Sequence, residues 1–273
     1  MNRPMMCRSC KKLMGVADNC PWCGTARPGK TSEFFSRFAP NLLSPHMSVG
    51  EIIIKISIAF FIVELLAVLL LGGFSAFIKS IWSVPGGVID LLGASSPELF
   101  NGRWWGPLTA SWLHGGGLHI LFNMMAVRQI TDFIEQTTTR SFTWTAYILT
   151  GAGGFALSAL AGHFSCGASA SIFGLIGLGM AIAFLLGNGA DDPMFKALLS
   201  WAAMGLLFGF LFPGIDNTAH LGGLLTGGIL GLIWSTWRSK KWFHWVLPKL
   251  VVGLWGLTII GFLYSILNKL QII

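Results

Sequence analysis

Residues 167–187 read GASASIFGLIGLGMAIAFLLG, an apolar run that begins with two closely spaced serines. The run carries no charged side chain, and its length matches the roughly 20 residues that a helix needs to cross a bilayer. Polar groups inside a membrane helix are costly, so Ser169 and Ser171 each suggest a structural or chemical role.

The rest of the chain has the same membrane character. Of its 273 residues, 53% are hydrophobic and 11% are charged, whereas soluble domains carry about 25% charged residues. The predicted fold class is therefore an all-α polytopic membrane protein. The first thirty residues are polar and rich in cysteine, so we expect no cleavable signal peptide. We predict seven membrane-spanning helices, at residues 51–74, 115–134, 142–163, 168–187, 195–212, 217–236 and 246–267.

The basic residues predict how these helices are oriented. With the N-terminus in the cytoplasm, most lysines and arginines fall on the inner side, and only Lys79, Arg103 and Lys269 fall outside. The positive-inside rule requires this asymmetry of a multi-pass protein of the cell membrane. The net charge of +7 then reflects topology, so we expect the lipid bilayer as a partner and no nucleic acid.

Four cysteines form two Cys-x2-Cys pairs near the N-terminus. Two such pairs can supply four thiolates to a zinc ion, and the site would be structural because no coordination position stays open. A reducing cytoplasm disfavours disulfides, and a redox role for the Cys-Pro-Trp-Cys element lacks the surrounding βαβ pattern, although iron or redox chemistry remains the alternative. The predicted zinc ligands are Cys7, Cys10, Cys20 and Cys23.

From these features we predict that the chain has four parts. Residues 1–30 form a small zinc-ribbon-like head in the cytoplasm, for which we expect a soluble partner. Residues 31–48 form a polar linker, residues 49–240 a core of six helices, and residues 241–273 a seventh transmembrane helix.

Three polar clusters begin the second, fourth and sixth predicted helices. In the orientation above, all three helices run from the outer face inward, so the clusters share one depth. No spacing within a single helix could produce that coincidence, which predicts one composite site opening to the outer face. The clusters are His114, His119 and Asn123; Gly167 to Ser171; and Asp216 to His220.

The chemistry of these residues predicts a nucleophile and a base. A serine hydroxyl becomes an effective nucleophile when a base within hydrogen-bond reach takes its proton. Ser169 and His220 could meet, because Gly223 and Gly227 would let the sixth helix approach the fourth closely. Phe173, one turn below Ser169, could stack on the imidazole, so that no aspartate is needed as a third member.

His119 and Asn123 are the predicted oxyanion donors. Their spacing of four residues places them on one helical face, where both can donate hydrogen bonds to a developing oxyanion. Ser171 is the rival nucleophile, but two residues turn a helix by about 200°, so Ser169 and Ser171 cannot face the same helix. Catalysis needs no cofactor in this scheme. The predicted supporting residues are His114, Gly167, Phe173, Gly223 and Gly227.

Together, these motifs resemble those of the rhomboid family. Residues 167–174, GASASIFG, look like its nucleophile motif, and residues 219–227, AHLGGLLTG, are similar to its base-bearing helix. Residues 114–123, HGGGLHILFN, resemble its second helix, and residues 104–109, WWGPLT, its first outer loop. The resemblance extends over residues 91–228 and implies a six-helix core. It also implies an intramembrane serine endopeptidase that cleaves transmembrane segments of membrane proteins with a Ser–His dyad.

Two departures from the family pattern support a second hypothesis. Ala170 stands where the family usually has glycine after the nucleophile, and it would crowd the oxyanion pocket slightly. Gly106 stands where the first outer loop usually has arginine, which removes a stabilising cation unless Arg103 replaces it. The alternative is a catalytically silent rhomboid-like protein that binds membrane helices. A transporter or channel is disfavoured, because the polar groups cluster near one face and no inverted repeat is apparent.

Each residue also has a plain structural interpretation. Serines in membrane helices often bond a carbonyl of the preceding turn, and His119 and Asn123 could join helices by hydrogen bonds. Taken jointly, these interpretations require three coincidences at one depth.

We read Cys166 as a small apolar filler and His163 as interfacial. The tryptophans expected at the headgroup level are Trp82, Trp104 and Trp105.

Overall fold

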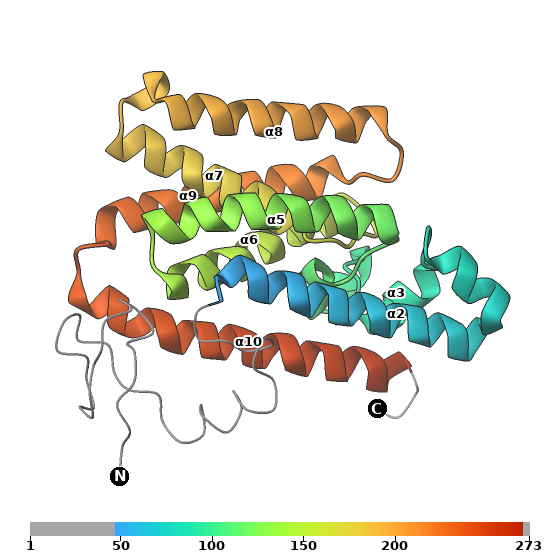
Figure 1. Cartoon of the computed structure of the whole chain (residues 1–273). Helices are drawn as coiled ribbons and strands as arrows, with labels where there is room; N and C mark the ends of the chain where they lie inside the picture. Colours follow the sequence, from blue (N-terminus) through green and yellow to red (C-terminus); the bar gives the residue numbers. More distant parts are fainter. Residues whose placement is uncertain (1–46, 270–273) are drawn as a thin grey trace, which may run out of the picture.

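The computed structural model describes residues 47–269, most of which are helical and none of which forms a strand (Figure 1). The predicted zinc-ribbon-like head, with Cys7, Cys10, Cys20 and Cys23, lies outside the described residues, as does most of the linker. The long helices of the described part are α2 (Val49–Ser80), α5 (Gly117–Thr137), α6 (Arg140–Leu160), α7 (Ser169–Leu186), α8 (Pro193–Leu211), α9 (Asn217–Trp237) and α10 (Lys241–Lys269).

Several helices begin at a residue whose side chain caps the first turn. Ser48 and Glu51 form a capping box at the start of α2, and Thr139 and Asp192 cap α6 and α8. The predicted first span ended at residue 74, close to Gly73, where α2 is interrupted by a backbone with φ 74°. Local sequence therefore accounts for where these helices start and break.

Four of the long helices, α2, α7, α8 and α10, are long and apolar enough to cross a membrane. The other three carry polar side chains that are buried inside the protein, including Asn123 in α5, Thr150 in α6 and His220 in α9. Burial keeps these polar groups out of the hydrocarbon. Their presence lowers the apolar content of the three helices. The prediction of a polytopic, all-α membrane protein agrees with this architecture.

Helix α7 is the centre of the bundle, because every residue from 170 to 179 is buried. Its most extensive contact is with α9, and α6, α8 and α5 also pack on it (Figure 1). Glycines make the α7–α9 contact possible: a methyl group on Gly223 would overlap the carbonyl oxygen of Ala170, and one on Gly227 would overlap that of Gly174. This close approach sets the relative position of the residues at the start of both helices.

The segment between α2 and α5 folds into short helices, and one buried arginine holds it together. Arg103 Nη1 lies 2.6 Å from Asp90 and 2.9 Å from Glu98, and Lys269 of α10 lies 2.6 Å from Asp90. Burial raises the pKa of Asp90, but hydrogen bonds from Lys269 and Arg103 outweigh it and hold the pKa below its ordinary value. Arg103 therefore supplies the cation that Gly106 does not. The short helices are α3 (Gly86–Leu92), η1 (Pro97–Asn101), α4 (Gly106–Thr109) and η2 (Ala110–Trp112).

The expectation that Trp105 lies at the headgroup level is wrong. Its side chain is 2% exposed, and its ring lies 4.9 Å from that of Tyr264 in α10. Trp82 and Trp104 are exposed, and their place at the headgroup level stays a prediction. The seventh helix covers the loop at Trp105, and nothing in the local sequence indicated where that helix would pack.

Candidate active site

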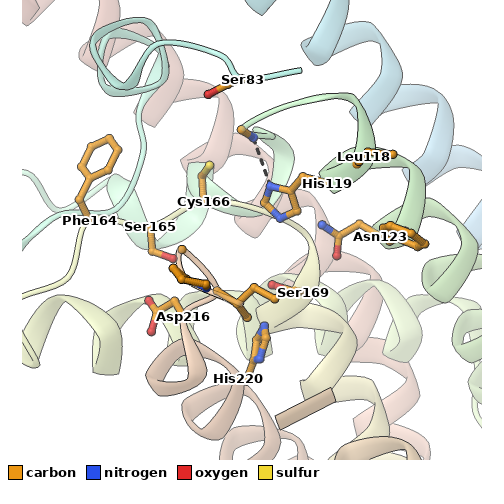
Figure 2. A pocket seen from close by; sticks show the side chains of 15 residues that line it. Ser83, Leu118, His119, Asn123, Phe164, Ser165, Cys166, Ser169, Asp216 and His220 are labelled. Atoms are coloured by element: carbon orange, nitrogen blue, oxygen red, sulfur yellow. Dashed lines mark hydrogen bonds between the residues drawn. The ribbon is translucent and has the colours of Figure 1, made fainter. Parts of the chain in front are cut away.

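A cavity of about 590 Å³ lies at the end of the bundle where α5, α7 and α9 begin (Figure 2). It brings together members of all three polar clusters that the sequence placed at one depth. Loop residues before α7 and between α8 and α9 complete its wall. The polar side chains that line it include His119, Asn123, Ser165, Ser169, Asp216 and His220.

Ser169 is the first residue of α7 and faces this cavity. Gly167, two residues earlier, has φ 125°, a backbone conformation that favours glycine, and its N–H donates to the carbonyl of Ala110 at 2.9 Å. Ser171 faces the other way: it is fully buried, and its hydroxyl lies 3.1 Å from that of Ser111. Of the two serines, only Ser169 is placed to meet a molecule in the cavity.

His220 approaches Ser169 from α9. Its imidazole is 5% exposed and stacks on the ring of Phe173, with centroids 4.1 Å apart and planes 8° from parallel. Figure 2 shows the imidazole directed toward Ser169. The contacts of the described residues include no hydrogen bond between the two side chains. Such bonds are often long in a free enzyme and shorten when substrate binds.

Two side-chain donors point at the loop before Ser169. His119 Nδ1 accepts the N–H of Gly115 at 3.2 Å, which leaves the proton of a neutral imidazole on Nε2. A methyl group on Gly167 would lie 2.6 Å from His119 Nε2 and 3.5 Å from Asn123 Nδ2. Asn123 Nδ2 is buried and has no hydrogen-bond partner within residues 47–269. Both N–H groups are therefore available to an oxygen atom bound beside Ser169.

The expected crowding by Ala170 is wrong. Ala170 is fully buried and does not line the cavity. Its methyl group packs toward α6, where a methyl on Gly154 would lie only 2.8 Å from it. A helix turns by about 100° per residue, so the residue after Ser169 faces a different neighbour.

His114 is not part of the cavity wall. It is fully buried, and its ring lies 5.3 Å from that of His119. The N–H of His114 donates to Glu64 Oε1 at 3.0 Å, so this carboxyl of α2 supports the turn that precedes α5. Sequence reasoning missed Glu64, although an acidic residue in the middle of the apolar stretch 51–74 was a usable signal.

For two further residues of the cavity wall, the structure adds to what the sequence predicted. Cys166, read as a filler, is half-buried and borders the cavity. Asp216 was placed in the composite site without a role, and its side chain begins α9 by accepting two backbone N–H groups. Among residues 47–269, no group of three His, Cys, Asp or Glu side chains is arranged to hold a metal ion.

Comparison with known proteins extends these observations. The rhomboid domain matches residues 101–237, half of the chain. The chain is 35% identical over 133 residues to RHOMBOID-like protein 4 of Arabidopsis thaliana, covering 47% of this chain and 34% of that protein. It is 39% identical over 144 residues to RHOMBOID-like protein 6, mitochondrial, of the same plant, covering 50% and 46%.

The name of one fungal relative states an enzymatic activity. The chain is 31% identical over 157 residues to rhomboid-type serine protease 2 of Emericella nidulans, covering 54% of this chain and 29% of that protein. The chain thus spans less than half the length of each of these relatives. The matched domain contains His119, Asn123, Ser169 and His220. With half of its length matched, and with His119, Asn123, Ser169 and His220 inside that match, this multi-pass membrane protein belongs to the rhomboid family.

Proposed function

We propose that this protein is an intramembrane serine endopeptidase that cleaves transmembrane segments of other membrane proteins. One observation carries the proposal: Ser169 and His220, from two different helices, face one cavity in which His119 and Asn123 present free N–H groups. The name of the fungal relative, a rhomboid-type serine protease, supports the same reaction. The catalytic core is residues 49–240, and it needs no cofactor.

In the proposed reaction, His220 takes the proton of Ser169 while Ser169 Oγ attacks the carbonyl carbon of the scissile bond. His119, Asn123 and the backbone N–H of Ser169 stabilise the negative oxygen of the tetrahedral intermediate. The imidazolium of His220 then protonates the leaving amine, the C–N bond breaks, and an acyl-enzyme remains. Water, deprotonated by His220, then attacks the ester carbon. The C–O bond to Ser169 breaks, His220 returns the proton to Ser169 Oγ, and the new carboxyl end of the substrate is released. Phe173 orients the imidazole by stacking on its face, a role that a carboxylate has in other serine proteases.

Cleavage of a membrane helix by the purified protein tests this proposal. The full-length protein is reconstituted in liposomes with a tagged single-span substrate, and the products are identified by mass spectrometry. We expect one defined cut with wild type and none with Ser169→Ala. A wild type that binds substrate helices and cuts none of them would establish the alternative, a catalytically silent rhomboid-like protein. The two departures that motivated this alternative, Ala170 and Gly106, no longer favour it, because Ala170 lies outside the cavity and Arg103 holds the loop.

We also propose that the cavity opens to the outer face and that the N-terminus is cytoplasmic, because Arg238, Lys240 and Lys241 resist translocation. In a background in which all five native cysteines are replaced by serine, a membrane-impermeant thiol reagent should label Ile215→Cys, in the turn before α9, from outside intact cells. It should not label Ser239→Cys, in the turn before α10. The reverse pattern of labelling would contradict the orientation.

The four N-terminal cysteines are proposed to bind one structural zinc ion. Thiolates in two Cys-x2-Cys pairs suit zinc, and the fold of so small a head would depend on the metal. The full-length protein should contain one zinc per chain, and Cys20→Ser should lose it while Cys166→Ser retains it. Equal zinc content in all three proteins would contradict the assignment. Cleavage should persist in Cys20→Ser, because the proposed catalytic core is residues 49–240 and all of its catalytic residues lie within that range.

A further inference from the structure

The carboxylate of Asp216 occupies a fixed place at the rim of the cavity. Its Oδ1 accepts the N–H groups of Thr218 and Ala219, both at 3.0 Å, and so caps α9. Its other oxygen accepts the hydroxyl proton of Ser158, which lies near the end of α6. The side chain is 12% exposed. Asp216 therefore joins α6 to the start of α9, one turn before His220.

Within residues 47–269, no lysine or arginine forms an ion pair with the carboxylate of Asp216. Burial raises the pKa of Asp216, but hydrogen bonds from Ser158, Ala219, Ser165 and His163 outweigh it and hold the pKa below its ordinary value. Its recorded ion-pair partner in the described part of the chain is His163, whose Nδ1 lies 3.2 Å away and whose side chain is half exposed. Asp216 is therefore ionised at neutral pH.

We propose that Asp216 is a positioning residue whose charge acts through His220. The backbone N–H of His220 donates to the carbonyl of Asp216 at 3.2 Å, and both side chains line the same cavity. When His220 takes the proton of Ser169, it becomes an imidazolium. The carboxylate of Asp216, one helical turn away, stabilises this cation, and solvent screens the attraction only weakly because Asp216 is mostly buried. The inference rests on the proposed proteolytic function.

This arrangement differs from a catalytic triad. The oxygens of Asp216 are occupied by the helix cap, Ser158 and His163, and His220 Nδ1 has no hydrogen-bond partner within residues 47–269. Stacking on Phe173 orients the imidazole, and the carboxylate contributes an electrostatic field. Other titratable groups near His220 are His119, which faces it from α5, and Cys166, whose side chain borders the same cavity, while His163 pairs with Asp216.

Asp216→Asn separates the charge from the cap. The amide oxygen can still accept the two N–H groups of α9, so the fold should be retained, whereas the negative charge is lost. We expect kcat to fall about three- to tenfold, and the acid limb of the pH profile to move down by about half to one pH unit, with KM unchanged. Asp191→Asn, an exposed carboxylate at the opposite end of α7, is the charge-matched control and should leave the profile unchanged.

His163→Gln supplies a test of sign. It removes the ion-pair partner of Asp216 and leaves the negative charge of Asp216 in place, so the acid limb should move up, opposite to the shift in Asp216→Asn. A purely structural role for Asp216 would lower thermal stability and leave the acid limb in place. The inference is overturned if wild type cleaves and the acid limb of Asp216→Asn coincides with that of Asp191→Asn. If wild type does not cleave, the proposed function fails, and this inference fails with it.

Discussion

Ser169→Ala is expected to reduce cleavage of a transmembrane substrate by at least about 10³-fold, to the background of the assay. The reason is geometric: Ser169 is the serine of α7 that lines the cavity shared with His220, His119 and Asn123. Without its hydroxyl no acyl-enzyme can form, and the oxyanion donors have no intermediate to stabilise. The rate constant is measured with purified protein in liposomes, where substrate and enzyme share one bilayer.

Ser171→Ala is the matched control for this loss. Ser171 has the same chemistry two positions later, but its hydroxyl is buried against Ser111. Removing one hydroxyl–hydroxyl bond costs about 1 kcal/mol of stability, so this variant should retain most of its activity. If instead Ser171→Ala were inactive and Ser169→Ala active, the nucleophile assigned to this protein would be wrong.

Gly227→Ala should remove both stability and activity. The added methyl group would overlap the carbonyl oxygen of Gly174, which is backbone and cannot rotate away, so α9 must move off α7. Overpacking of this kind costs about 1–3 kcal/mol or more. Because His220 lies on α9, the same movement displaces the base from Ser169. Thermal unfolding in detergent and the cleavage rate should fall together.

Gly228→Ala is the control on the next residue of the same helix. A methyl group there meets no atom within 4 Å, and alanine is a better helix former than glycine by about 1 kcal/mol. Gly228→Ala should therefore match or exceed the stability of wild type. Similar melting temperatures for Gly227→Ala and Gly228→Ala would contradict the close α7–α9 contact.

Much of this fold could be predicted from the sequence, because a membrane helix is a local feature. An apolar run of sufficient length between polar segments indicates each long helix, and basic residues predict its direction. The composite site could also be anticipated, since polar side chains at the start of alternate helices lie at one end of the bundle. Ser169 and His220 were identified in this way, and the structure places both in one cavity.

Features that depend on packing between distant segments could not be predicted. The burial of Trp105 depends on α10, and the replacement of the missing loop cation depends on Arg103 reaching Asp90. Ala170 was expected to crowd the site, because the sequence does not show that its methyl group packs against Gly154 of α6. The role of Asp216 needed the positions of Ser158 and His163, which follow from the tertiary structure alone.

Reaction of the full-length protein with a fluorophosphonate, followed by peptide mapping, tests the central claim most directly. The reagent phosphonylates a serine only when a base activates it, so it reports the nucleophile without any knowledge of the natural substrate. The account predicts a single adduct on Ser169, which is absent in His220→Ala and retained in Ser171→Ala. An adduct on Ser171, or a wild type in which no serine reacts, would contradict it.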